Sequence, residues 1–93
     1  MNVVWSPRAI READRAARYI ARDRPRAAVN WLTGLRGVVG RLAEFPYSGH
    51  SLPELPNSPR LELPYGGYRV IYRVRPDRVE ILRVVHARRN MIR

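Results

Sequence analysis

The sequence predicts a single α+β domain over residues 1–93, in which an N-terminal strand and an antiparallel two-helix hairpin pack on a small antiparallel sheet. Two observations predict this class. Apolar residues recur at helical spacing in the first half of the chain, and they alternate with polar residues at strand spacing in the last third. A length of 93 residues allows one hydrophobic core. The expected order is strand, helix, helix, loop and a three-strand meander.

The N-terminal strand and the first helix meet at a capping signal. Asn2–Trp5 form a short apolar run, which predicts a strand. Ser6 then offers a hydroxyl N-cap, and Pro7 suits the first helical position. A narrow apolar stripe follows at Ile10, Ala13, Ala17 and Ile20. Two oppositely charged pairs with a spacing of four indicate a solvated face: Arg8 with Glu12, and Asp14 with Arg18.

A second helix begins after the break at Asp23-Arg24-Pro25 and is expected to end before Pro46. Its wide apolar face comprises Ala28, Trp31, Leu32, Leu35, Val38, Val39, Leu42 and Phe45. The short connection predicts an antiparallel hairpin. Glycines interrupt this helix at positions 34, 37 and 40, and each costs roughly 1 kcal/mol relative to alanine. Two interpretations stay open: a smooth track for a partner helix, or glycines tolerated in a helix that its core face holds.

The last third of the chain predicts three antiparallel strands. Residues 46–59 contain four prolines and are expected to form an extended surface loop. The strands are expected at Arg60–Tyr65, Tyr68–Arg75 and Arg78–His86, and Gly66-Gly67 makes a tight turn. The N-terminal strand must join this sheet, because alone it could not satisfy its backbone hydrogen bonds. Three tyrosines alternate with the arginines and are expected to face the core: Tyr65, Tyr68 and Tyr72.

Several classes of chemistry lack their residues in this sequence. The chain has no cysteine, which excludes disulfides and cysteine-ligated metals. No glycine-rich phosphate loop or nucleophile elbow is present. His50 and His86 have no metal-like spacing around them. We therefore expect no cofactor and no metal, and we also expect no signal peptide and no membrane span.

The excess of positive charge is the strongest compositional signal. Eighteen basic residues, all arginine, oppose eight acidic ones, so the formal net charge is +10. Residues 60–93 alone carry nine arginines against Glu62, Asp77 and Glu80. The alternation places Arg69 and Arg73 on one sheet face, with Arg60 nearby in a tight register. This cluster predicts an anionic partner, such as nucleic acid, the ribosome or an acidic protein. The alternative is a set of solvated surface arginines.

The sequence also resembles a known superfamily over essentially its whole length. The opening "VVWSPRA", the helix start "RAAVNWL" and the segment "FPYSGHSLPEL" look like the ParE/RelE superfamily of bacterial toxins. The segments "GYRVIYRV" and "VEILRVVHARRN" add to this resemblance, which is greater to the ParE-like, plasmid-stabilisation branch. It implies the toxin of a type II toxin–antitoxin pair, held in a cytoplasmic hetero-oligomer by an acidic antitoxin segment. The residues expected to bind that antitoxin are Trp31, Leu35, Arg69 and Arg73.

RelE-like members of the superfamily cut mRNA on the ribosome, and the resemblance to them is incomplete. Cleavage by a ribose 2′-OH needs a base, a proton donor and charge stabilisation at the phosphate. Arg60, Arg69 and Arg88 occupy positions comparable to the RelE basic residues. Glu62, however, replaces a lysine, and the C-terminal tyrosine is missing. His86 either substitutes as an acid or base, or packs at the end of its strand.

ParE-like members inhibit DNA gyrase without being enzymes, and their C-terminal strand and tail are implicated. In this chain that region is Ile81–Arg93, and the expected target-binding residues are Arg83, His86, Arg88, Arg89 and Asn90. The resemblance thus predicts a gyrase-inhibiting toxin that an antitoxin neutralises. A RelE-like ribosome-dependent endoribonuclease is the alternative, so whether the protein is an enzyme stays open. A nontoxic nucleic-acid-binding module, or a decayed toxin, is a further alternative.

Overall fold

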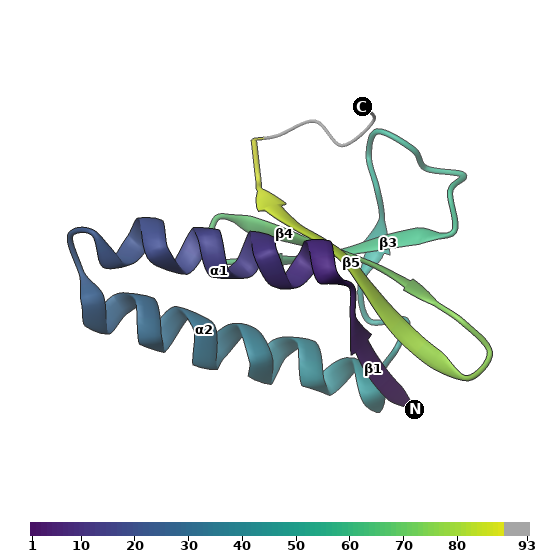
Figure 1. Cartoon of the computed structure of the whole chain (residues 1–93). Helices are drawn as coiled ribbons and strands as arrows, with labels where there is room; N and C mark the ends of the chain where they lie inside the picture. The colour runs from purple at the N-terminus through teal and green to yellow at the C-terminus, as the bar shows by residue number, and fades with distance from the viewer. Residues whose placement is uncertain (89–93) are drawn as a thin grey trace.

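The structure is a computed structural model that describes residues 1–88 and confirms the predicted α+β fold. Two antiparallel helices lie against one side of a five-stranded sheet (Figure 1). The elements are β1 (Asn2–Trp5), α1 (Pro7–Ala21), α2 (Pro25–Gly40), the 3-10 turn η1 (Arg41–Ala43), β2 (His50–Ser51), β3 (Arg60–Tyr65), β4 (Tyr68–Val74) and β5 (Arg78–His86). The strand order is β1-β5-β4-β3-β2. None of the helices within residues 1–88 is long and apolar enough to cross a membrane.

The sheet is mixed, whereas the sequence predicted antiparallel pairing. β1 joins the sheet as expected, but it runs parallel to β5, with Trp5 opposite Ile81. The Ser6 N–H continues this pairing to the Ile81 carbonyl at 2.9 Å, and the Ser6 hydroxyl then caps α1 by accepting from the Ala9 N–H at 3.0 Å. β1 therefore stops where its helix begins. Beyond this point β5 pairs only with β4, and its other edge has no strand beside it.

The main core lies between the helices and the sheet. Leu35, Val39 and Leu42 pack there against Tyr72 and other residues of β4 and β5. The face of α1 in this core is made of alanines: Ala9, Ala13, Ala16 and Ala17. Ile10 was expected on this face but is 54% exposed, and Phe45 is 55% exposed because the regular helix ends at Gly40. The short alanine side chains let α1 lie close to its neighbours.

A bulge in β5 sets the direction of the side chains near its end. Ile81 lies opposite Tyr72, but Arg83 lies opposite Ile71, so Leu82 is an extra residue in the ladder. Directly opposed residues share a face. After the bulge, Arg83 therefore shares the face of Ile71 that is turned away from the helices. We call this the outer face of the sheet.

The proline-rich segment was expected to be only a surface loop, yet it covers part of the outer face. Leu52 is fully buried and packs with Ile71 and Val85 in a second small core, to which Leu55 adds. The segment also contains β2, which pairs with β3. At the other end of β3, the turn at Gly66 and Gly67 has φ of 46° and 80°, the left-handed conformation that a two-residue hairpin needs.

Candidate functional site

Arg69 is the centre of a buried ion cluster on the outer face. Its Nη1 and Nη2 donate to the two Glu54 carboxylate oxygens at 2.6 and 2.7 Å, and its Nε donates to Glu62 Oε1 at 2.5 Å. Arg69 is only 8% exposed and Glu62 only 6%. The bonds to Glu54, followed by those to Glu62, raise the pKa of Arg69 against the effect of burial. The guanidinium is thus engaged by two carboxylates.

An open cavity of about 610 Å³ lies over this cluster. Arg88 and the aromatic residues Tyr65 and Tyr68 line it together with Glu54, Glu62 and Arg69. The carboxylates lie at the position where a cleavage site for RNA needs positive charge for the phosphate. The cavity therefore brings Arg69 and Arg88 together, but with the wrong electrostatic surroundings for phosphate.

The other residues of the RelE-like set lie apart from this cavity. Arg60 pairs with Arg73 across β3 and β4, whereas Pro64 pairs with Arg69. Four residues along a strand separate Arg60 from Pro64, or about 13 Å. His86 borders a different cavity, of about 230 Å³, with Glu12, Arg15 and Tyr19. The four residues thus do not converge on one reaction centre within the described part of the chain.

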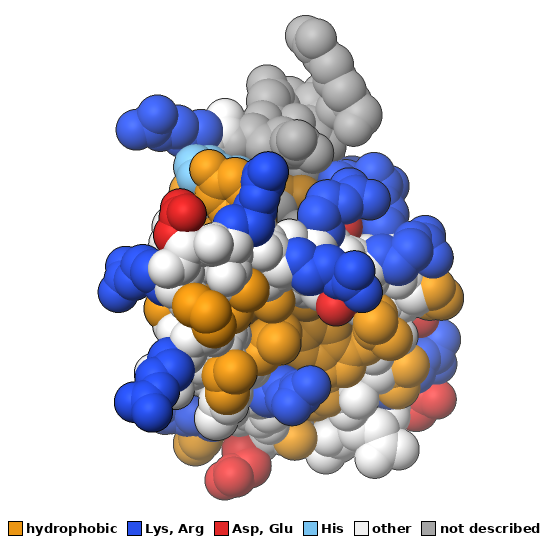
Figure 2. Space-filling view, turned by 60° about the vertical axis from the view of Figure 1, so that its left-hand side comes forward, with side chains coloured by type: hydrophobic (Ala, Val, Ile, Leu, Met, Phe, Trp, Pro, Cys, Tyr) orange, Lys and Arg blue, Asp and Glu red, His pale blue; other side chains and the backbone are white. Residues whose placement is uncertain are grey.

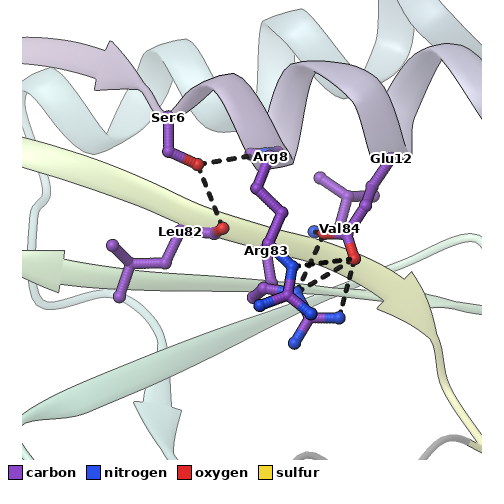
Figure 3. A network of polar contacts seen from close by, with 7 residues as sticks. Ser6, Arg8, Glu12, Leu82, Arg83 and Val84 are labelled. Carbon is purple, nitrogen blue, oxygen red and sulfur yellow. Dashed lines mark hydrogen bonds and ion pairs between the residues drawn. The ribbon is translucent and has the colours of Figure 1, made fainter.

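Arg83 forms an ion pair that fastens α1 to the unpaired edge of β5 (Figure 3). Its Nη2 lies 2.7 Å from Glu12 Oε2, and both side chains are nearly buried. The backbone N–H of Val84 donates to Glu12 Oε1 at 2.9 Å, and the Ser6 hydroxyl donates to the Leu82 carbonyl at 3.1 Å. The side chains of Glu12 and of Ser6, the N-cap of α1, thus satisfy the edge of β5 that β1 does not reach. Arg8, the partner that the sequence predicted for Glu12, lies farther away at 3.8 Å.

The pKa of Glu12 reflects this arrangement. Burial raises it, but the hydrogen bonds from Arg83 and from the Val84 N–H, with the charge of Arg83, outweigh burial and lower the pKa overall. Glu12 is therefore held as a carboxylate. Arg83, expected to contact a target, already has its charge neutralised by this residue.

His86 and Arg88 are exposed at the end of β5. The His86 ring meets the Tyr68 ring edge-on at 5.5 Å, and its Nδ1 accepts from the Arg88 N–H at 3.2 Å. The Ala87 N–H donates to the Gly67 carbonyl at 2.8 Å, which holds the chain end against the β3–β4 turn. Arg89 and Asn90, also expected to bind the target, lie outside the described residues.

Of the residues expected to bind an antitoxin, two lie on α2 and pack toward the core. Trp31 is half-buried between the rings of Tyr65 and Tyr68, at 5.8 and 5.1 Å. Leu35 is fully buried below an apolar cavity of about 380 Å³ between the helices, with Ile10 and Leu32 at its wall. Figure 2 shows an apolar area of the surface bordered by arginines. Arg69 is buried in its ion cluster, while Arg73 is half-buried on the outer face.

The long-range partners of two carboxylates, Glu54 and Glu12, were not expected from the sequence. Glu54 lies in the proline-rich loop. Glu12 lies four residues after Arg8, so the spacing predicts that pair and gives no indication of the pair with Arg83. Within residues 1–88, no group of three or more metal-ligating side chains comes together.

Comparison with known proteins assigns the family. The family described as "ParE toxin of type II toxin-antitoxin system, parDE" matches residues 3–91. The chain therefore belongs to the ParE family of toxins of type II toxin–antitoxin systems.

One similar protein supports this assignment, and a solved structure shares the fold. "Putative toxin Y4kP" of Sinorhizobium fredii (strain NBRC 101917 / NGR234) is 36% identical over 86 residues, which cover 92% of this chain and 88% of that protein. The solved structure of a "Chromosomal ParDE TA system from P. aeruginosa" matches with a TM-score of 0.78 and covers 92% of this chain and 95% of that one. At 19% identity, this second likeness concerns the fold.

Proposed function

We propose that this protein arrests growth by inhibiting DNA gyrase, and that a cognate antitoxin with an acidic segment neutralises it in a cytoplasmic hetero-oligomer. Membership of the ParE family supports the first part. The likeness to a chain described with a ParDE system, together with the net charge of +10, supports the second.

The state of Arg69 is the observation that carries the choice of gyrase over mRNA cleavage. An RNA-cutting site needs free positive charge where the phosphate becomes more negative. Here Glu54 and Glu62 engage all three guanidinium nitrogens of Arg69. Moving a phosphate to this arginine would set it beside two carboxylates. This cluster therefore argues against a nuclease site on the outer face.

The end of β5 is the proposed gyrase-binding region. His86 and Arg88 are exposed there and are available to a partner. Arg89 and Asn90 follow directly in the chain and are proposed as further contacts. In this proposal Arg83 is a positioning residue, because its bond to Glu12 fastens this end of β5 to α1.

A supercoiling assay with purified gyrase tests the proposal. The wild-type protein is expected to inhibit the enzyme, and Arg88→Gln is expected to weaken inhibition roughly tenfold, as for the loss of one charged contact. Arg22→Gln, which changes another exposed arginine at the C-cap of α1, serves as the matched control and should inhibit like the wild type. Undiminished supercoiling at all toxin concentrations would contradict the proposal.

A parallel assay of ribosomal mRNA cleavage separates the alternatives. Arg69→Ala is a poor probe of the endoribonuclease, because it would leave two buried carboxylates without their partner and destabilise the fold. Arg60→Gln avoids that problem. If the wild-type protein cleaves mRNA and leaves gyrase unaffected, and Arg60→Gln abolishes the cleavage, the RelE-like alternative is supported. If the protein shows neither activity but binds nucleic acid in a salt-sensitive way, the alternative of a nontoxic module is supported.

A further inference from the structure

Among residues 1–88, the buried and half-buried arginines have a carboxylate partner, with two exceptions. Arg69 pairs with Glu54 and Glu62, and Arg83 pairs with Glu12. The other half-buried arginines with partners are Arg75 and Arg78, which share Glu80. Arg60 and Arg73 are half-buried too, yet neither has a carboxylate within ion-pair distance among residues 1–88. Removing a cation from water without a counter-charge is unfavourable, so these two arginines require a separate explanation.

The two exceptions face one another. Arg60 and Arg73 are direct partners across β3 and β4, on the outer face. Residues so opposed have Cβ atoms about 5 Å apart, and like charges there repel. The nearest acids along the sheet are already engaged: Glu62 by Arg69, and Glu80 by Arg75 at 2.9 Å and Arg78 at 3.1 Å. Glu80 lies directly opposite Arg73 across β4 and β5, but its two oxygens bond Arg75 and Arg78, so Arg60 and Arg73 keep a local excess of positive charge.

Ser58 holds one member of the pair in place. Its hydroxyl oxygen accepts from the Arg60 backbone N–H at 3.1 Å and from Arg60 Nε at 3.3 Å. The terminal guanidinium nitrogens of Arg60 have no acceptor within residues 1–88. A guanidinium fixed at Nε with its outer nitrogens open is prepared to donate to a carboxylate or phosphate oxygen.

We propose that Arg60 and Arg73 form one anion site that binds a single carboxylate side chain of a protein partner. The proposal rests on the proposed function in that an acidic antitoxin segment is the partner it fits. A nucleic-acid strand fits less well, because a strand running along β3 would pass from this pair to the carboxylates of Glu54 and Glu62, which already engage Arg69. One isolated anion avoids that repulsion.

Side-chain NMR of the arginine Nε–H groups tests the site directly, with sodium acetate as the probe. The Arg60 and Arg73 signals are expected to move along one common curve and to reach half-saturation at a concentration several-fold lower than the Arg36 signal. Arg36 is an exposed arginine of α2 and serves as the reference. Arg73→Gln should raise the half-saturation at Arg60 at least threefold. Shifts at Arg60 and Arg73 no larger than at Arg36 would overturn the proposal.

A second titration separates a protein partner from a nucleic acid. The probes are the one-glutamate peptide Ac-Ala-Leu-Glu-Leu-Ala-NH2 and pentathymidylate. The peptide is expected to act mainly on the Arg60 and Arg73 signals, and the oligonucleotide on the exposed helix arginines. If the oligonucleotide causes its largest signal shifts at Arg60 and Arg73, the site binds nucleic acid and the carboxylate assignment is overturned.

Thermal unfolding gives an independent measure of the repulsion within the pair. Arg60→Gln or Arg73→Gln should raise the melting temperature more at about 10 mM than at about 500 mM ionic strength, because salt screens repulsion but not packing. The double variant should gain less than the sum of the two. Arg36→Gln should show no such difference between the two salt concentrations. If Arg60→Gln or Arg73→Gln instead lowers the melting temperature more at low salt than at high salt, these arginines have a stabilising partner and the proposal is overturned. These measurements use no gyrase, so their failure and that of the proposed function are distinct.

Discussion

At the scale of single residues, Gly34 has a role that neither open interpretation of the helix glycines included. A Cβ at this position would lie 2.2 Å from the Tyr65 hydroxyl oxygen. That hydroxyl donates to the Trp31 carbonyl at 2.9 Å. Gly34 therefore admits the tip of a sheet side chain to α2, whereas Gly37 has open space around it.

Substitution of these two glycines by alanine should consequently have opposite effects on stability. Gly37→Ala should stabilise the protein by about 0.5–1 kcal/mol, since alanine favours the helix and nothing obstructs it. Gly34→Ala should destabilise it by about 1 kcal/mol or more, because Tyr65 must move and its hydrogen bond is lost. Urea unfolding measures both. In a Tyr65→Phe background the cost of Gly34→Ala should largely disappear, and a persistent cost would contradict this explanation.

At the scale of elements, the proline-rich segment contributes a core residue. Leu52 fills the small core on the outer face with Ile71 and Val85. Leu52→Ala should destabilise the protein by about 2–4 kcal/mol through the cavity it leaves. Leu55 is only partly buried beside the same residues, so Leu55→Ala is the matched control and should cost less. Equal, small effects of both substitutions in urea unfolding would show that the segment behaves as an ordinary surface loop.

The attachment of α1 to β5 predicts a dependence of stability on pH. The folded-state pKa of Glu12 is lowered from its ordinary value of 4.5. Its stabilising contribution is therefore present above about pH 4.5 and is lost as the pH falls through the folded-state pKa. Glu12→Gln should destabilise the protein by about 2 kcal/mol at pH 7, since Arg83 loses its charged partner.

Unfolding measured between about pH 3 and pH 6 checks this prediction. The free energy of unfolding should fall less steeply with acid in Glu12→Gln than in the wild type. Some slope should remain, because bonds from Arg75 and Arg78 also lower the pKa of Glu80. An unchanged slope would mean that Glu12 does not titrate differently in the folded and unfolded states.

At the scale of the whole molecule, a net charge of +10 opposes compaction. The nearly buried ion pairs of Arg69 and Arg83 are screened little by salt, whereas repulsion among the exposed arginines is screened strongly. Raising NaCl from about 20 to about 200 mM should therefore increase the melting temperature. A decrease in calorimetry would show that exposed ion pairs, not repulsion, dominate the electrostatics of folding.

The sequence by itself determined the order of the elements and most of their bounds. Capping at Ser6, the proline at the start of α2 and the glycine turn of β3–β4 are local signals, and each acts over a few residues. The alternation in β3 and β4 likewise predicted which side chains face the core, because the period of a strand is a local property. The resemblance then indicated the family that the comparisons assign.

Only the tertiary structure decided which charges meet. Glu12 and Arg83 are 71 residues apart in the chain, and the bulge at Leu82 sets the face on which Arg83 lies. Glu54 reaches Arg69 because Leu52 anchors its loop on the outer face. The sequence shows the number of arginines but not their partners, since an ion pair depends on folded distances and burial. The folded chain leaves Arg60 and Arg73 opposed and without a carboxylate among the described residues.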